Sequence, residues 1–181
     1  MVKYVALLRR INISGKNKIP MKDLKFEFER LGYKDVVTYL NSGNVVFSSD
    51  TDDKNKMYGD IYKMIESKFG FKIPLYIISA EELKDLLDHH PNWWGNVNKD
   101  IYDNIIFIIP PTTYKEVYDT LGEPKKDYEK IEEYKNNIFW SYILKDYRKT
   151  NWWSKTASTS ISNSITVRTA NTMKKVLELC D

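Results

Sequence analysis

The loop at residues 9–16, RRINISGK, is the part of this sequence best equipped for chemistry. It combines positively charged side chains with neutral hydrogen-bonding groups and one glycine, and a predicted helix with an anion-favouring N-terminus follows it. This combination could hold a phosphate; the alternative is a solvated loop in which glycine supplies a positive φ. The candidate ligand-binding residues in the loop are Arg9, Arg10, Asn12, Ser14, Gly15 and Lys16.

The same loop departs from a phosphate-binding P-loop, whose pattern is G-x-x-x-x-G-K-[ST]. Arg10 stands where the first glycine belongs, and Asn17 stands where Ser or Thr would bind magnesium. A bulky residue at the first position usually prevents backbone N–H groups from converging on a phosphate. No acidic strand end of the Walker B kind lies nearby, so we do not expect a P-loop NTPase.

Basic residues are concentrated at the two ends of the chain. Residues 1–22 hold six Lys or Arg and no acid, and residues 147–177 hold six more and again no acid. Residues 23–146 hold 16 basic and 23 acidic residues, a net charge of −7, although the whole chain carries +3. If the ends lie side by side, they form one positive surface that attracts phosphates; otherwise they are two separate solvated faces.

The usual residues of metal sites and nucleophilic catalysis are scarce. His89 and His90 are the only histidines, and adjacent residues on a helix point about 100° apart, so they do not form a metal site together. The single cysteine, Cys180, lies next to the C-terminus, where it has no disulfide partner. We therefore expect no metal and no cofactor, and the catalytic residues, if any exist, stay unassigned.

Residues 1–79 show the order β-α-β-β-α-β. An apolar strand at 2–9 precedes a helix that starts after Pro20 and closes at Gly32. Two β-rich segments, DVVTYL and NVVFSS, flank a predicted tight turn at 41–44. A helix ending near Gly70 and the strand KIPLYIIS complete this half. The turn adds three candidate ligand-binding residues, Asn41, Ser42 and Asn44.

Residues 101–181 repeat this order without visible sequence identity. The strand YDNIIFII precedes a helix closed by Gly122, and two strands flank a turn at Lys135-Asn136. A weaker helical stretch at 151–160, the strand SITVR and a terminal helix NTMKKVLEL follow. Residues 80–100 form a linker helix, opened by a Ser79–Glu82 capping box, and a loop. The prediction is an α+β protein of two tandem ferredoxin-like plaits, at 1–79 and 101–181, with a C-terminal helix.

Aromatic residues are abundant in the predicted strand NNIFWSYIL and in two tryptophan pairs, Trp93-Trp94 and Trp152-Trp153. Plaits that bind RNA stack bases on exposed sheet aromatics. Both faces of this strand are apolar, however, so packing is the better interpretation. Each tryptophan pair either covers a core edge or forms a binding rim.

The segments KYVALLRRINISGKNKIPMKDL, YKDVVTYLNSGNVVFSS and ITVRTANTMKKV resemble the bacterial domain of unknown function 1697. The resemblance covers nearly the whole chain and implies two α/β plait subdomains, but no activity. The family usually has Gly where this chain has Arg10, and usually an Asn-Trp pair where this chain has Thr169-Ala170. Arg168 and Asn171 match the closing motif in part and are candidates to complete an anion site if the chain ends meet.

Composition restricts the function classes without selecting one. A chain of 181 residues with 42% hydrophobic and 29% charged residues is typical of a folded protein, and it contains no apolar run of the length of a membrane span. We expect a cytoplasmic monomer or weak homodimer, not a membrane protein. The leading hypothesis is a non-catalytic module that binds nucleic acid, a nucleotide or another phosphate. The alternatives are an enzyme acting on a small phosphorylated or carboxylated metabolite, and a structural or interaction module.

Overall fold

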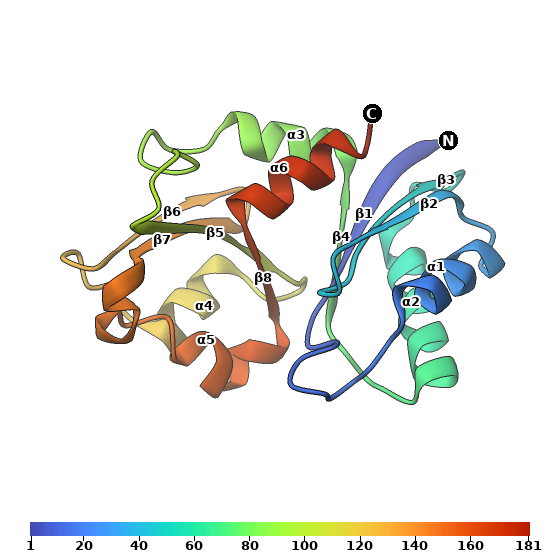
Figure 1. Cartoon of the computed structure of the whole chain (residues 1–181), viewed down its shortest axis with the longest axis horizontal. Coiled ribbons are helices and arrows are strands. Elements are labelled where there is room, and N and C mark those ends of the chain that lie inside the picture. Colours follow the sequence, from blue (N-terminus) through green and yellow to red (C-terminus); the bar gives the residue numbers. More distant parts are fainter. The chain divides into compact units, whose positions relative to one another are not determined.

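The computed structural model describes all 181 residues. The chain divides into two compact units, residues 1–84 together with 175–181, and residues 85–174. Each unit contains one antiparallel four-stranded sheet (Figure 1). The domain boundaries drawn from the sequence stay a prediction. No helix has the length and apolar character needed to cross a membrane.

The sheet of the first unit has the strand order β2-β3-β1-β4. All neighbouring strands are antiparallel, and β1 pairs with β3 on one side and with β4 on the other. This is the strand order of a ferredoxin-like plait. The elements are β1 (Val2–Leu8), α1 (Met21–Arg30), β2 (Lys34–Tyr39), β3 (Asn44–Ser49), α2 (Lys54–Phe69), β4 (Leu75–Ser79) and α3 (Ala80–Asp88).

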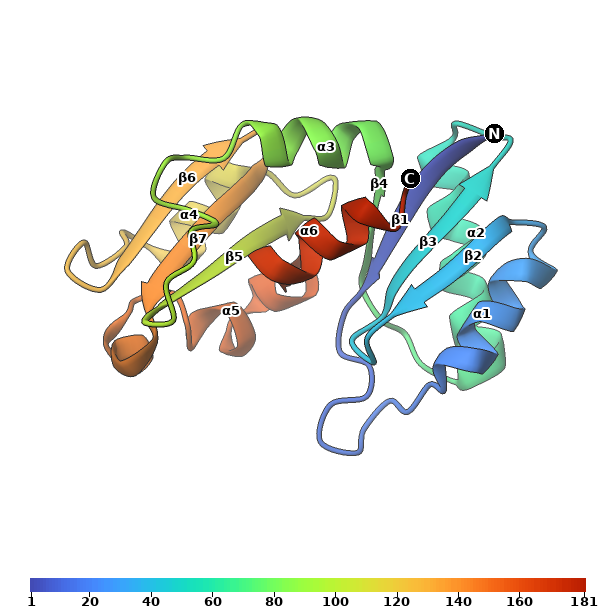
Figure 2. The ribbon, with the colours of Figure 1, turned by 45° about the horizontal axis from the view of Figure 1, so that its top comes forward.

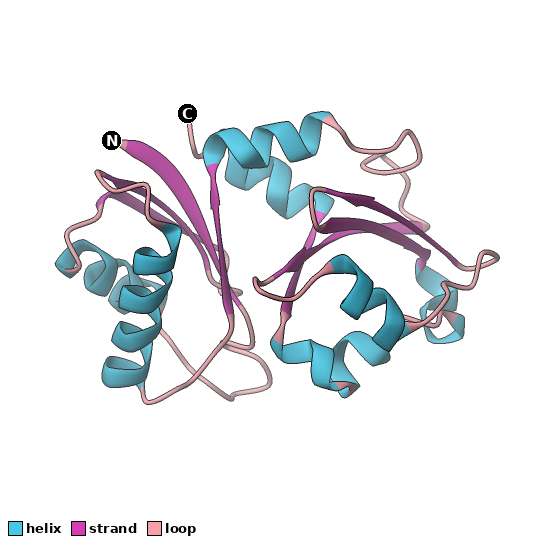
Figure 3. Ribbon diagram, turned by 180° about the vertical axis from the view of Figure 1, so that it is seen from behind, coloured by secondary structure: helices cyan, strands magenta, loops and turns pink.

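The first core forms where α1 and α2 cover one face of this sheet (Figure 3). The helical spacing of Leu24 and Phe28 points these side chains inward, and both are fully buried. The Phe28 ring lies 5.4 Å from that of Phe47 on β3, in an edge-to-face arrangement. Residues 4–8 of β1 are buried without alternation, so both faces of this central strand are covered.

Local sequence signals fix the ends of several elements as predicted. The helix α2 ends at Gly70, whose φ of 77° is left-handed. The predicted Ser79–Glu82 capping box is confirmed, because the Ser79 N–H donates to Glu82 Oε2 at 2.9 Å and the Glu82 N–H donates to Ser79 Oγ at 3.1 Å.

The sheet of the second unit has the equivalent order, β6-β7-β5-β8. The hairpin turn at Lys135-Asn136 has positive φ at both residues, 47° and 62°, as the favoured two-residue turn requires. The elements are β5 (Ile101–Ile108), α4 (Tyr114–Leu121), β6 (Glu129–Tyr134), β7 (Asn137–Ile143), the 3₁₀ helix η1 (Leu144–Lys149), α5 (Lys155–Ser158), the 3₁₀ helix η2 (Ser160–Asn163), β8 (Ile165–Thr169) and α6 (Ala170–Glu178).

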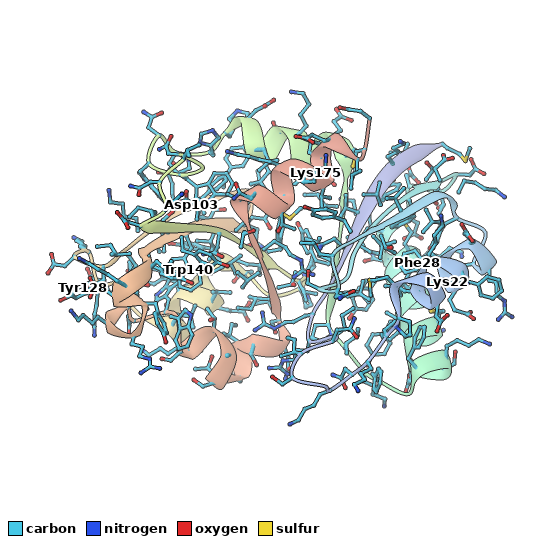
Figure 4. All side chains as sticks on the ribbon, in the orientation of Figure 1. Lys22, Phe28, Asp103, Tyr128, Trp140 and Lys175 are labelled. Carbon is cyan, nitrogen blue, oxygen red and sulfur yellow. The ribbon has the colours of Figure 1, made fainter.

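The two faces of the second sheet are covered by different parts of the chain. Asp103 and Trp140 come from neighbouring strands and lie on opposite faces (Figure 4). Trp140 belongs to the core formed with α4 and the α5 region. The opposite face is covered by residues 85–100 and the first turn of α6 (Figure 1). The aromatic strand β7 is buried from residue 137 to 142, so the packing interpretation is confirmed.

Each tryptophan pair contributes one ring to a core. Trp94 and Trp152 are completely buried, whereas Trp93 is half-buried and Trp153 is 41% exposed. The weak helical stretch predicted at 151–160 is a single turn, α5, between two 3₁₀ helices. The order β-α-β-β-α-β therefore occurs twice, and the predicted α+β fold of tandem plaits is confirmed.

Candidate functional site: a basic loop at one end of the first sheet

The candidate loop between β1 and α1 is a small hairpin with a defined turn. Ser14 and Gly15 have φ values of 50° and 76°, and the Lys16 N–H donates to the Ile13 carbonyl at 2.9 Å. One residue further out on each side, the Asn12 N–H donates to the Asn17 carbonyl at 3.1 Å. Two central residues with positive φ form the type I′ turn that suits a two-residue hairpin, which explains the glycine. The loop therefore has a different shape from a P-loop, in which successive N–H groups converge on one phosphate.

The Asn12 side chain holds this hairpin to the rest of the unit. Its Oδ1 accepts from the Ile19 N–H at 2.8 Å, and its Nδ2 donates to the carbonyls of Ile19 and Asn41, each at 2.9 Å. Asn17 adds a bond from Nδ2 to the Arg10 carbonyl at 2.8 Å. Both asparagines have positive φ, which this residue type adopts more easily than most. Asn12 thus shapes the loop with the amide that the sequence analysis considered for ligand binding.

The predicted turn between β2 and β3 lies against the same loop (Figure 2). The Leu8 N–H donates to the Gly43 carbonyl at 2.9 Å, and Gly43 has a left-handed conformation, with φ of 84°. Asn44 is fully buried and donates from Nδ2 to the Tyr39 carbonyl at 2.8 Å and to Ser42 Oγ at 3.1 Å. The tight turn predicted at 41–44 is therefore confirmed. The structure therefore brings nine candidate residues to one end of the first sheet: Arg9, Arg10, Asn12, Ser14, Gly15, Lys16, Asn41, Ser42 and Asn44.

Positive charge gathers on the exposed side of this loop. Arg10, Lys16 and Lys18 are exposed, while Arg9 is half-buried. Burial and the nearby charge of Arg10 lower the pKa of the Arg9 guanidinium to about 10, so Arg9 is still protonated at neutral pH. Neither Lys16 nor Lys18 has a carboxylate within 4.0 Å of its Nζ, in contrast to Lys25 and Lys56, which face acids one helical turn away.

The remaining two candidates, Arg168 and Asn171, belong to the second unit. Arg168 is only 8% exposed, and its Nη1 donates to Thr166 Oγ1 and to the Val167 carbonyl, each at 2.9 Å. Those bonds hold the guanidinium along its own strand, β8. Asn171 is exposed in the first turn of α6 and lines a cavity of the second unit. The anion site that these two residues would complete if the chain ends meet stays a hypothesis.

Two buried carboxylates of the second unit were missed by the sequence analysis. Glu129 is 3% exposed and accepts hydrogen bonds from the Lys125 N–H at 3.0 Å, the Asn151 N–H at 2.6 Å and Trp140 Nε1 at 3.1 Å. Asp103 is 9% exposed and accepts from the Gly95 N–H at 3.0 Å and from the Ser141 hydroxyl. Asp103 stands among aromatic and apolar strand residues, which is a signal for burial, whereas Glu129 has mostly charged neighbours and gives no such signal.

The histidines and acids do not assemble into a metal centre. No group of three or more His, Cys, Asp or Glu side chains has an arrangement that could hold a metal ion. His89 stacks on Tyr134 with ring centroids 4.7 Å apart and is 3.5 Å from Asp85. A hydrogen bond from Lys135 is the main cause that holds the pKa of the Asp85 carboxyl below its usual value.

The fold and the loop define an α+β protein of two tandem plaits whose first plait presents a basic hairpin. The chain belongs to the family described as "Protein of unknown function (DUF1697)", whose model matches residues 1–139, and the resemblance stated from the sequence is thereby confirmed. It is also similar to the conserved bacterial protein SP0830 from Streptococcus pneumoniae, with 26% identity and a TM-score of 0.87 over 99% of each chain. No curated protein matches this chain.

Proposed function

We propose that this protein is a non-catalytic module that binds a phosphate-bearing ligand through the basic hairpin of its first unit. The observation that carries the proposal is a preformed loop whose exposed cations, Lys16 and Lys18, face no carboxylate of their own. Charges of one sign on an ordered protrusion attract an anion without first breaking internal ion pairs. Arg10 adds a third exposed cation, and Ser14 adds a hydroxyl at the tip.

Preorganisation supports binding by this loop. Asn12, Asn17 and the Ile13–Lys16 turn fix its backbone, so little conformational entropy remains to be lost when a ligand binds. The side chains of Asn12 and Asn44 are occupied by internal hydrogen bonds. They therefore act as positioning residues, and the contacts to phosphate come from Arg10, Ser14, Lys16 and Lys18.

The test is a titration with three phosphate probes, namely pyrophosphate, ATP without magnesium and a ten-nucleotide oligouridylate, at two salt concentrations. Each Lys or Arg that contacts a phosphate of a single strand contributes about 0.7 to the slope of log K against log salt. We expect Lys16→Ala and Lys18→Ala each to weaken binding and to flatten that slope. Preference for the oligonucleotide over ATP would indicate nucleic acid as the source of the phosphate, and equal binding would indicate a small molecule.

The matched control is Lys63→Ala, because Lys63 is exposed on α2 and, like Lys16, has no ion pair. It removes the same charge from a different place, so the control should bind like the parent. The proposal is wrong if the parent binds none of the three probes, or if Lys63→Ala weakens binding as much as Lys16→Ala does.

A further inference from the structure

A cavity of about 470 Å³ in the second unit has no part in the proposed function. Its walls come from the loop at residues 95–99, the start of β5, the first turn of α6 and Leu144. The volume falls in the range of small-molecule sites, roughly 300–1,000 Å³. All of these residues belong to one compact unit, so the shape of the cavity is a property of that unit.

The loop that forms one wall is anchored at its start. Trp94 is completely buried, donates from Nε1 to the Asn104 carbonyl at 2.8 Å and packs edge-to-face on Phe139 with centroids 5.1 Å apart. The next peptide is held on both sides: the Gly95 N–H donates to Asp103 Oδ2 at 3.0 Å, and the Gly95 carbonyl accepts from Lys174 Nζ at 2.6 Å. Gly95 has φ of 77°, and a Cβ there would lie 3.2 Å from Lys174 Nζ. Hydrogen bonds and packing within the unit therefore hold this wall in place.

The charges that line the cavity do not cancel. Lys99 and Lys174 contribute two positive charges, and neither has a carboxylate within 4.0 Å. Asp103 is the one acid in the lining, and its two oxygens already accept from Gly95 and Ser141. The lining is thus net positive, and the positive end of the α6 dipole has the same sign.

The rest of the lining divides into amides and apolar surface. Side-chain amides come from Asn96, Asn98 and Asn171, and apolar surface comes from Ile101, Tyr102 and Leu144. Amides near lysines suit the oxygens of an anion, while the apolar wall suits a hydrocarbon or aromatic body.

We propose that this cavity binds a small organic anion, with its phosphate or carboxylate group at Lys99 and Asn171 and its apolar body against Ile101, Tyr102 and Leu144. This ligand class follows from a lining that combines positive charge and amides with apolar surface. The site differs from the basic hairpin, which carries no comparable apolar wall in the proposed contacts and belongs to the other unit. Either proposal can therefore be wrong without affecting the other.

Three probes of similar body and different charge test the proposal: phenyl phosphate, benzoate and neutral benzyl alcohol. We expect the two anions to bind at least tenfold more tightly than the alcohol, by calorimetry and by amide chemical shifts in 15N spectra of the whole chain. The shifted signals should come from residues 95–99 and 169–174. Stronger binding of phenyl phosphate than of benzoate would identify phosphate as the preferred group, and the reverse order would identify carboxylate.

Two variants carry the decision, Lys99→Glu and Asn171→Asp, because both side chains are exposed and their replacement leaves the anchors of the loop intact. Each should weaken binding of the anions about tenfold and leave benzyl alcohol unaffected. Lys63→Glu, with the same change of charge in the first unit, and Lys16→Glu in the hairpin should both bind like the parent. The proposal is overturned if the parent binds no anion at millimolar concentration, if the alcohol binds equally well, or if Lys63→Glu matches Lys99→Glu.

Discussion

The two units share a strand order but bury different kinds of side chain. In the first unit the buried polar residues are Asn44, Ser48 and Ser49, none of which carries a charge. The second unit buries three charged side chains, those of Asp103, Glu129 and Arg168, with several threonines and asparagines. Because an unpartnered buried charge is costly, each of the three charged groups needs dedicated hydrogen bonds, and the structure supplies them.

The difference follows from how each unit covers its sheet. In the first unit the sheet is covered in part by α2, a helix of 16 residues. The backbone N–H and C=O groups of this helix bond to one another, and its apolar side chains pack against the sheet. The second unit uses a four-residue helix between two 3₁₀ helices, which leaves many backbone groups to be satisfied otherwise. Side chains do so: Glu129 accepts from the Asn151 N–H at 2.6 Å, and the hydroxyls of Thr150 and Thr156 donate to the carbonyls of Tyr147 and Trp153 at 2.7 and 2.9 Å. One fold topology therefore tolerates different numbers of buried polar side chains, provided that the backbone groups of its irregular segments have hydrogen-bond partners.

The largest effect on stability is expected for a variant of the second unit, at one of its buried charges. Glu129→Ala removes the acceptor of two backbone N–H groups and one buried indole N–H, and leaves these donors without their partner. We expect the free energy of unfolding to fall by about 3 kcal/mol. Tryptophan fluorescence in urea is the measurement, because all five tryptophans lie between residues 93 and 153, within the second unit.

The control for this variant is Glu132→Ala, three residues along the same strand and exposed. It should change stability by less than about 0.5 kcal/mol. Equal losses for the two variants would show that the buried carboxylate has no special part in holding the irregular segment.

A smaller effect on stability is expected in the first unit, where the variant disturbs close packing rather than a buried charge. A Cβ at Gly43 would lie 2.7 Å from Ile11 Cδ1 and 2.8 Å from Leu8 Cβ, and φ there is 84°. Gly43→Ala should therefore cost about 2 kcal/mol, partly from backbone strain and partly from crowding. Gly70→Ala is the matched control, since φ is 77° but no atom lies within 4 Å of the added Cβ.

The control variant should lose about 1 kcal/mol, from backbone strain alone. Urea unfolding followed by far-UV circular dichroism measures both, because the first unit contains no tryptophan. If Gly43→Ala and Gly70→Ala lose the same amount, the loop and the turn are not packed as tightly as the structure indicates.

The smallest effect concerns the capping box and is visible in its dependence on pH. Burial raises the pKa of Glu82, but hydrogen bonds from Lys54 and Ser79 outweigh it and lower the pKa below its usual value. A carboxyl with a lowered pKa in the folded state stabilises the protein above its unfolded pKa, about 4.3, and that contribution is lost as the pH falls.

Glu82→Gln keeps the capping geometry and removes the charge. Because the side chain is half exposed, we expect it to cost only about 0.5 kcal/mol at pH 7. The difference between variant and parent should vanish near pH 3, as measured by urea unfolding at both pH values. A difference that is unchanged at pH 3 would assign the effect to shape rather than charge.

Much of the local structure could be predicted from the sequence because its causes are local. The turns at Asn41-Ser42-Gly43 and Lys135-Asn136, the helix end at Gly70 and the Ser79–Glu82 box each depend on residues a few positions apart. The candidate residues of the loop and the turn do lie together at one end of the first sheet, but the roles of their side chains were not predictable. The amide of Asn12 is occupied by Ile19 and Asn41, seven and 29 positions away.

The sequence by itself determined the order of elements, the doubled plait and the concentration of basic residues at the two ends. Hydrophobic periodicity, turn residues and charge can all be recognised from residues that are close together in the sequence. Only the tertiary structure decided which polar residues are buried. Glu129 and Glu132 stand three positions apart in one strand, yet the first is enclosed by Trp140, Lys125 and Asn151 and the second is exposed. Burial depends on which distant segments pack against a residue, and that information belongs to the assembled fold rather than to any neighbourhood of the sequence.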